Sequence, residues 1–420
     1  MARGIAALLL VATVAALAGY AAAAPGAAGR GPTPVTRPRI DGVPEIGAQL
    51  AARSGWWKGA RPLHITYRWQ RCGPDGCFAV ALGRTYTVRP ADAKHVLRVV
   101  VRVRNRTGAR AATSKTTTAV VAPPTVDAAG DIACDPTSAS FVGGAGKGMN
   151  CREQATSDLI VADQPTAVLP LGDDQYECGR ADAFAASYDP SWGRAKPVTH
   201  PAIGNHEYGT ACHTNDPSPY FDYFGAAAGT RYQGWYSYDL GTWHLIALNS
   251  ECNYGRGSEA VGGCGPGSPQ ETWLRHDLET HPNACTLAYW HEPRFSSGEH
   301  GDAQQMATIW NDLVAAHADV VLSGHNHDYE RFDPIGAAPQ ETDLHQQPAP
   351  DPLGIREFVV GTGGRNTYTF RNAPPLRGEV VRNSDTFGVL HLTLEPGGYE
   401  WRFEPIAGES FTDSGSGACN

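Results

Sequence analysis

Five short motifs between residues 130 and 327 contain side chains of the types that bind metal ions. They are Gly130-Asp131-Ile132-Ala133, Gly172-Asp173-Asp174-Gln175-Tyr176, Gly204-Asn205-His206-Glu207, His291 after the apolar run 286–290, and Gly324-His325-Asn326-His327. Each motif alone is a weak signal, but together they supply two Asp, one Tyr, one Asn and three His, enough for two metal ions. Two adjacent cations are a standard device for in-line displacement at phosphorus. The set therefore predicts phosphoester chemistry.

The elements that must position these side chains are the strands of an α/β core. Strands are predicted over 125–132, 166–172, 198–203, 243–249, 285–291, 319–323, 355–361 and 386–394, with helices over 152–163, 269–280 and 302–317. Four motifs follow predicted strands and His291 ends a fifth, and ligands gather at the carboxyl ends of strands in open α/β sheets. A simple turn is the usual explanation of one Gly-Asp or Gly-Asn pair. It does not account for five strand ends that each carry a candidate ligand.

Three of the candidates, Asp131, Asp173 and Tyr176, offer oxygen anions. A phenol with an ordinary pKa of about 10 is deprotonated only by a strongly polarising cation. This donor set favours a trivalent ion, Fe(III), with His327 as its nitrogen ligand. Taken alone, Tyr176 would be interpreted as a packed turn residue. Its position three residues after Asp173 favours the interpretation as a metal ligand.

The remaining candidates, Asn205, His291 and His325, are neutral donors. Neutral nitrogen and amide oxygen donors suit Zn(II), Mn(II) or Fe(II). Asp173 is the best candidate to bridge this second ion and the first.

The motifs resemble those of the calcineurin-like metallophosphoesterases and, within them, the purple acid phosphatases. The wider superfamily has Asp-x-His at the first motif, where Ala133 stands here, and the purple branch has a Tyr in the second motif, where Tyr176 stands. The resemblance covers about 125–405 and implies a sandwich of two mixed sheets flanked by helices. It implies Fe(III) on Asp131, Asp173, Tyr176 and His327, and a divalent ion on Asp173, Asn205, His291 and His325.

Two further histidines, His206 and His300, stand where the family places histidines around the phosphate. The Ser-Ser-Gly-Glu segment before His300 differs from the family's sequence at this place. By this resemblance a metal-bound hydroxide attacks the phosphorus, and either histidine could protonate the leaving alkoxide.

The first residues are typical of an export signal. Arg3 precedes an apolar run at 5–18, and small residues follow at 21–24, so residues 1–24 are expected to be cleaved. The alternative, a membrane anchor, needs roughly 20 apolar residues. We expect a flexible Ala, Gly and Pro-rich lead-in over 25–34, a secreted or cell-wall-associated protein, and no membrane span.

Ten cysteines follow, and an even number in an exported chain favours disulfides over zinc ligation, which would need closer spacings such as C-x-x-C. The sequence leaves the pairing open. Cys72–Cys77 and Cys252–Cys264 are expected locally, because each pair flanks a Gly-rich turn.

Residues 35–122 alternate apolar and polar side chains over short runs, which predicts a small β-sandwich. The segment resembles bacterial immunoglobulin-like domains through loose motifs such as Gly55-Trp56-Trp57 and Asn105-Arg106-Thr107-Gly108. Ala122-Pro123-Pro124 is the expected linker to a phosphoesterase domain over 125–405, with a tail over 406–420. A basic cluster is expected to be a solvated face, with contact to an anionic cell-wall polymer as the alternative: Arg98, Arg102, Arg104, Arg106 and Arg110.

The formal net charge of −9 argues against non-specific nucleic-acid binding as the main role. The leading hypothesis is a secreted phosphatase that acts on a small phosphate monoester. A phosphodiesterase acting on nucleotides or lipid head groups is the first alternative. A cell-surface binding protein with an inactive phosphoesterase-like domain is the second, and the seven intact candidate ligands count against it.

Overall fold

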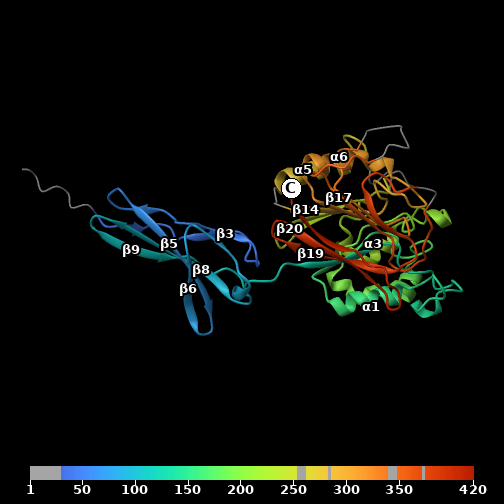
Figure 1. Ribbon diagram of the computed structural model, residues 1–420, viewed down its shortest axis with the longest axis horizontal. Helices are drawn as coiled ribbons and strands as arrows, with labels where there is room; N and C mark the ends of the chain where they lie inside the picture. Colours follow the sequence, from blue (N-terminus) through green and yellow to red (C-terminus); the bar gives the residue numbers. More distant parts are fainter. Residues whose placement is uncertain (1–29, 253–261, 282–284, 339–347, 371–373) are drawn as a thin grey trace, which may run out of the picture.

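The computed structural model describes residues 30–252, 262–281, 285–338, 348–370 and 374–420. It has two β-rich parts, which we call the N-terminal part (30–122) and the C-terminal part (125–420), joined at Ala122-Pro123-Pro124 (Figure 1). Among the described residues, no helix is both long enough and apolar enough to cross a bilayer. The expected signal peptide lies outside the described residues.

The N-terminal part is a sandwich of short antiparallel strands. Its strands are β1 (Thr33–Pro34), β2 (Arg39–Asp41), β3 (Gln49–Arg53), β4 (Trp57–Lys58), β5 (His64–Gly73), β6 (Gly76–Leu82), β7 (Thr85–Thr87), β8 (Val96–Asn105) and β9 (Gly108–Thr113). A sheet in the order β2-β3-β7 packs on one in the order β6-β5-β8-β9, and β1 pairs with β4. The prediction of a β-sandwich is confirmed. The lead-in expected to reach residue 34 is shorter than predicted, because Thr33–Pro34 already pairs with β4.

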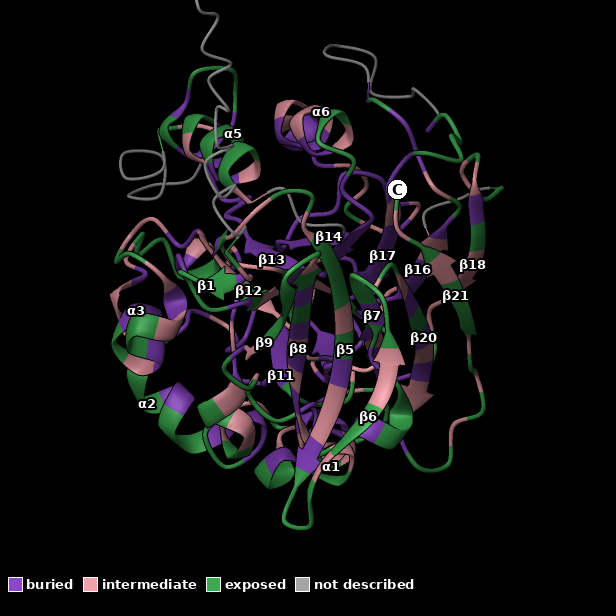
Figure 2. Ribbon diagram, turned by 90° about the vertical axis from the view of Figure 1, so that its left-hand side faces the viewer, coloured by how far each residue is buried: buried purple, intermediate pink, exposed green. Residues whose placement is uncertain are grey.

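Alternation of buried and outward-facing side chains along the strands of the N-terminal part explains its core. In β8, Leu97, Val99, Val101 and Val103 are fully buried, while the residues between them face outward (Figure 2). They pack around Trp69 of β5, which is also fully buried. Replacing this tryptophan with Ala would cost roughly 3–5 kcal/mol of stability.

The C-terminal part contains two mixed sheets, as the resemblance implied. The five-stranded sheet has the order β11 (Ala167–Pro170), β10 (Thr125–Ala129), β19 (Gly388–Glu395), β20 (Gly398–Pro405), β21 (Ser414–Ala418). The seven-stranded sheet has the order β12 (Tyr236–Leu240), β13 (Trp243–Ala247), β14 (Cys285–Tyr289), β15 (Val320–Ser323), β17 (Arg356–Val360), β16 (Tyr329–Phe332), β18 (Glu379–Asn383). The main hydrophobic core contains side chains of both sheets, which therefore face each other.

Helices cover the outer faces of these sheets (Figure 1). The helices α5 (Pro269–Thr280) and α6 (Ala307–Ala315) pack through a second hydrophobic core on the seven-stranded sheet. Within β13, Leu245 belongs to the main core and the next residue, Ile246, to the second. Because both faces of this sheet are buried at its centre, the strands β13, β14 and β15 are mainly apolar. Helix α1 (Glu153–Asp163) contacts β19 on the other sheet, and the short helices α2 (Ala181–Ala183) and α3 (Ser218–Phe224) contact each other.

Two predictions about secondary structure are wrong. The expected strand at 198–203 is a 3-10 helix over Trp192–Val198 followed by extended backbone, which touches β11 only through isolated bridges at Thr199 and Ala202. Pro197 and Pro201 remove backbone donors there, so a continuous ladder cannot form. The segment 406–420 is no tail, because β21 extends the five-stranded sheet. Its Ser and Gly residues carry no apolar alternation, which is why the sequence pattern missed it.

All ten cysteines are paired. Both local pairings, Cys72–Cys77 and Cys252–Cys264, are confirmed, and the other disulfides are Cys134–Cys151, Cys178–Cys212 and Cys285–Cys419. The last one joins the start of β14 to the residue after β21, so the two sheets are covalently linked. In the chain-entropy account, a disulfide that closes a loop as long as that between Cys134 and Cys151 stabilises the folded state by about 3 kcal/mol.

Candidate metal centre

The five motifs meet because they occupy loops at the carboxyl ends of strands from both sheets. Asp131 and Asp173 follow β10 and β11, which are parallel neighbours, while His291 and His325 follow the parallel pair β14 and β15. Backbone hydrogen bonds tie the loops together, since the Gly130 amide donates to the Val360 carbonyl at the end of β17 (2.8 Å). Asn205 follows the extended segment beside β11 and reaches the same end of the sandwich.

Glycines in the motifs permit this close approach. A Cβ atom on Gly172 would lie 2.6 Å from Nδ1 of His291, and Gly172 has a φ of +83°. A Cβ atom on Gly204 would collide with the backbone and carboxylate of Asp173. The glycines therefore let two loops from different strands place their polar side chains against each other.

One group of donor atoms surrounds the Tyr176 hydroxyl. This oxygen lies 2.9 Å from Oδ1 of Asp131, 3.1 Å from Oδ2 of Asp173 and 3.0 Å from Nε2 of His327. The same His327 nitrogen lies 3.2 Å from Oδ1 of Asp131. All four side chains are buried. They are the four residues that the sequence assigned to the trivalent ion.

A second group of donor atoms surrounds Nε2 of His291. This nitrogen lies 3.2 Å from Oδ1 of Asn205, 3.2 Å from Nδ1 of His325 and 3.3 Å from Oδ2 of Asp173. Donor atoms of Asp173, His291 and His325 all lie within 4.8 Å of one another, which is compatible with a shared ion. Oδ2 of Asp173 thus belongs to both groups.

Hydrogen bonds around the second group orient its donors. The Nδ1–H of His291 donates to the Leu171 carbonyl (2.8 Å), so the lone pair of Nε2 points into the site. The amide nitrogen of Asn205 donates to the Thr210 hydroxyl (3.2 Å), which turns its oxygen toward His291. These hydrogen bonds fix the orientation of both donor side chains.

Backbone amides hold the two carboxylates. The His206 amide donates to Oδ1 of Asp173 (2.9 Å), and the His325 amide donates to Oδ2 of Asp131 (2.8 Å). Each carboxylate therefore has one oxygen fixed by the protein and one facing the donor groups.

Glu207 joins two of the motif loops. It accepts from the backbone amides of Gln175 (3.0 Å) and Gly204 (2.9 Å). Burial raises its pKa to about 8, with a further contribution from the Asp173 charge. The motif Gly-Asn-His-Glu contains this residue, but the sequence analysis assigned it no role.

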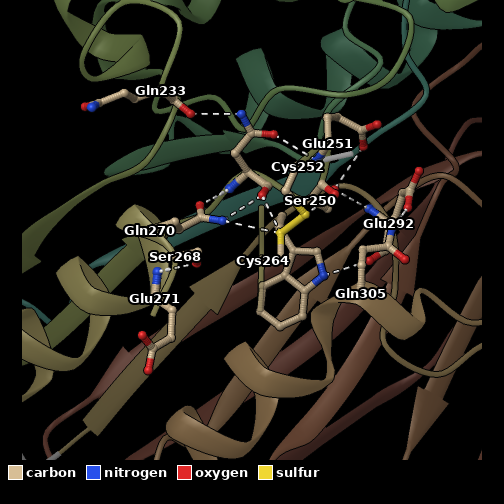
Figure 3. Close-up of a disulfide and its surroundings, with 12 residues drawn as sticks. Gln233, Ser250, Glu251, Cys252, Cys264, Ser268, Gln270, Glu271, Glu292 and Gln305 are labelled. Atoms are coloured by element: carbon tan, nitrogen blue, oxygen red, sulfur yellow. Dashed lines mark hydrogen bonds between the residues drawn. A yellow bond between two sulfur atoms is a disulfide. The ribbon is translucent and has the colours of Figure 1, made fainter. Parts of the chain in front are cut away.

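The loop after β13 supports the backbone beside His291 (Figure 3). The Glu292 amide donates to the Ser250 hydroxyl (3.0 Å), and the Asn249 amide donates to the side-chain oxygen of Gln270 on α5 (2.7 Å). The Cys252–Cys264 disulfide closes this loop. The disulfide therefore stabilises a segment that supports one candidate ligand.

The protonation chemistry of the first group fits a highly charged cation. Burial and the neighbouring Asp131 and Asp173 raise the pKa of Tyr176 well above its ordinary value. Burial opposes ionisation of Asp173, but the charges of His291 and His206 outweigh it and lower the pKa of that carboxyl. A phenol held between two carboxylates becomes a phenolate only beside a strongly polarising ion. Nε2 of His327 faces the Tyr176 hydroxyl and Asp131, while its Nδ1 is buried without a partner among the described residues.

His206 and His300 both lie against the donor groups. Nε2 of His206 lies 3.7 Å from Oδ2 of Asp173, while its Nδ1 lies 2.6 Å from the Glu177 carbonyl. The ring of His300 lies 4.5 Å from that of His325, measured between centroids. Burial lowers the pKa of His300. The structure thus brings all nine predicted side chains together.

Residues of the loop after β17 also lie at the site, and the sequence analysis missed them. Tyr368 stacks on His327 with ring centroids 4.1 Å apart, and the Arg365 guanidinium lies 5.2 Å from the centre of the Tyr176 ring. The Arg365 amide donates to the Asp131 carbonyl (2.9 Å). The Gly-rich run Gly361–Gly364 packs on the first motif, since a Cβ atom on Gly363 would collide with the Gly130 carbonyl oxygen. This run is the sequence signal that could have pointed to the loop.

Comparisons with known proteins identify relatives among the phosphoesterases. The family description "Calcineurin-like phosphoesterase" matches residues 142–329. Two proteins of Arabidopsis thaliana, purple acid phosphatases 15 and 23, are 24% and 26% identical to the chain over 52% and 54% of its length. These matches cover 43% and 53% of the two relatives, so the chain spans about half the length of the curated relatives it matches.

A solved structure extends the comparison to the fold. A purple acid phosphatase from yellow lupin (Lupinus luteus) seeds aligns with a TM-score of 0.52 and 17% identity. The alignment covers 92% of this chain and 74% of the lupin chain. At this identity the likeness concerns the fold alone.

Proposed function

Because the chain carries a calcineurin-like phosphoesterase domain of the purple acid phosphatase type, we propose that it hydrolyses phosphate monoesters at a centre of two metal ions. One observation carries this proposal: two groups of donor atoms share Oδ2 of Asp173. A shared carboxylate oxygen is what holds two cations side by side, and paired cations serve displacement at phosphorus.

In this proposal, the first ion is Fe(III), held by the oxygen-rich group: Asp131, Asp173, Tyr176 and His327. The second is Zn, Mn or Fe(II), held by the group that is mainly neutral: Asp173, Asn205, His291 and His325. When bound, the pair would lower the pKa of a water so that hydroxide is available to attack phosphorus, and it would offer positive charge to the phosphate oxygens. The phenol supports the trivalent assignment, since its raised pKa requires a strong Lewis acid to remove the proton.

The protein's own groups would complete the reaction. His206 has one nitrogen engaged by the Glu177 carbonyl, which leaves Nε2 for a phosphate oxygen. His300 is held by its backbone amide, which donates to Oδ1 of Asn326 (2.7 Å), and its ring lies against the rings of His325 and Tyr368. His300 is therefore the proposed proton donor to the leaving alkoxide, and His206 the proposed phosphate-binding residue.

A phosphodiesterase is the second candidate within the same chemistry, because the donor groups do not distinguish a phosphate monoester from a phosphate diester. An inactive binding protein is disfavoured, because no candidate donor is replaced and their supporting hydrogen bonds are intact. Metal analysis of the purified protein, run beside hydrolysis of aryl phosphate mono- and diesters, tests the proposal. Protein without bound iron, or faster turnover of the diester, would contradict it.

Five disulfides support an oxidising, extracellular location. We propose that the protein is secreted and that its N-terminal part holds it at the cell wall. Fractionation of the producing cells tests this location, and recovery of the reduced protein from the cytoplasm would contradict it.

A further inference from the structure

The two parts of the chain carry opposite charge. Residues 30–122 contain 17 Lys and Arg but only four Asp and Glu, whereas the whole chain has a net charge of −9. The N-terminal part is therefore strongly basic and the C-terminal part strongly acidic. Such an asymmetry points to an anionic partner for the basic part.

Most of the basic side chains in the N-terminal part have no carboxylate partner. Within 30–122, all of which the structure describes, the ion pairs are those of Arg39 and Arg53 with Asp41 and of Arg71 with Asp92. The positive charge is therefore not neutralised inside the fold.

Four arginines gather on one face of the four-stranded sheet, which we call the arginine face: Arg68, Arg98, Arg102 and Arg104. The strand register shows that they share this face. Arg102 and Arg104 lie opposite Thr66 and His64 of β5, Arg98 lies opposite Gln70, and Arg68 lies opposite Val100. Partners that lie directly opposite in an antiparallel pair point to the same side. None of the four strands contains an acidic residue. Figure 1 shows this sheet standing clear of the C-terminal part.

The arginine face continues into two grooves. One, of about 450 Å³, is lined by Arg98 of the face and by Arg37. The other, of about 530 Å³, is lined by Arg37, Arg39 and Lys115. Neither groove has an Asp or Glu in its lining. Arg98 and Arg37 thus connect the face and both grooves into one cationic track.

The surroundings of the arginines favour a linear phosphate polymer over a lipid surface. The positions beside them on the face include the small or polar Thr66, Gln70 and Ala111 and the half-buried Val100, and Leu82 is the large exposed apolar residue. A membrane-binding surface needs several apolar side chains to enter the interface. Guanidinium groups, in contrast, pair with phosphate oxygens through two hydrogen bonds.

We propose that the arginine face and its grooves bind a linear polyanion with repeating phosphate groups, and so hold the acidic C-terminal part near phosphate-rich material. This inference builds on the proposed surface contact and does not depend on phosphatase activity. Without such a site, the acidic C-terminal part would be repelled by the polymer.

The experiment measures binding of the full-length protein to end-labelled long-chain inorganic polyphosphate by fluorescence anisotropy. The test variant combines Arg98→Gln, Arg102→Gln and Arg104→Gln. The matched control removes three charges elsewhere in the same part, through Lys58→Gln, Arg84→Gln and Lys94→Gln. Both proteins are checked by melting temperature and by turnover of nitrophenyl phosphate, which we expect to equal the wild-type values.

We expect the test variant to bind polyphosphate about 10- to 100-fold more weakly, and the control to lose much less. For the wild type, the slope of log K against log salt concentration should be steep. The slope for the test variant should be smaller in magnitude by about 2. Equal losses in both variants would overturn the proposal, because net charge alone would then explain binding. A wild-type slope shallower than about −1 would overturn it even if the variant does not fold. Tighter binding to vesicles of anionic phospholipid than to polyphosphate would indicate that the arginine face binds a membrane, and it would overturn the proposal of a polymer ligand.

Discussion

Oδ2 of Asp173 lies 3.3 Å from Nε2 of His291, although the two residues follow strands of different sheets. The contact joins a carboxylate from the five-stranded sheet to an imidazole from the seven-stranded sheet. The same oxygen also approaches Tyr176. A change at this one side chain should therefore affect both proposed metal positions.

Asp173→Ala is predicted to lose both metal ions, whereas His325→Ala and Asn205→Ala should lose mainly the divalent ion. Turnover should fall by more than about 100-fold in each, because a donor that contacts the ion matters more than its supporting shell. Elemental analysis of the purified variants checks this, with His276→Ala on α5 as the histidine control. An Asp173 variant that retains two metals per chain would show that the carboxylate does not bridge.

Tyr176→Phe is predicted to remove the colour of the protein. A phenolate on Fe(III) gives a purple or pink charge-transfer band, and the substitution removes the phenolate while keeping the ring. Absorption spectroscopy checks this, with Tyr368→Phe as the control, since Tyr368 stacks on His327 and is not a proposed ligand. A colourless active wild type that contains only Zn or Mn would refute the iron assignment.

His300→Ala is predicted to slow alkyl phosphates much more than nitrophenyl phosphate, because a good leaving group needs little protonation. Loss of a general acid typically costs about 10²- to 10⁴-fold. Steady-state kinetics on both substrates, with metal content unchanged, check this. Equal losses on both substrates would leave His300 as a binding residue.

His206→Ala is predicted to weaken phosphate binding for both substrates alike. The reason is that the Glu177 carbonyl engages Nδ1 of His206, while Nε2 faces the donor groups at Asp173. Competitive inhibition by inorganic phosphate measures the effect. Unchanged inhibition in this variant would remove His206 from the proposed substrate site.

The N-terminal part is predicted to be dispensable for hydrolysis of a small aryl phosphate, since every proposed ligand lies after residue 124. The chain 125–420 should therefore bind both metals and turn over the substrate at the wild-type rate. A folded 125–420 chain that holds both metals without hydrolysing the substrate would contradict this.

Glu45 makes stability depend on pH at a contact between the two parts. Its carboxylate accepts from the Thr242 hydroxyl (3.3 Å), and burial raises its pKa from 4.5 to about 7. The folded protein therefore holds a proton that the unfolded chain has released, so this group's contribution is present below 4.5 and is lost as the pH rises through 7.

Glu45→Gln is accordingly predicted to melt at a higher temperature than the wild type above pH about 7, with the difference shrinking toward acid. Thermal denaturation across pH about 5 to about 8 measures this. A difference that does not change with pH would show that the carboxyl does not titrate in this range.

Local sequence patterns suffice to predict the strands that carry the core and the side chains that converge at their ends. Apolar runs such as 285–289 and 320–323 have no other stable place than a buried strand, and polar residues at their ends had to meet at one edge. Local pairing of Cys72 with Cys77 was likewise within reach, because the residues between them form a short hairpin.

Other features of the fold and the site depend on contacts between distant parts of the chain. The extended segment before Asn205 lacks a ladder because prolines remove its donors, and it reaches the site through contacts with β11 that no local pattern encodes. The Gly-rich β21 forms because an existing sheet edge and the Cys285–Cys419 disulfide hold it there. Arg365 and Tyr368 join the site because the loop after β17 bonds to the first motif. In each case the deciding contact is made between residues distant in the chain, and short-range periodicity carries no information about such contacts.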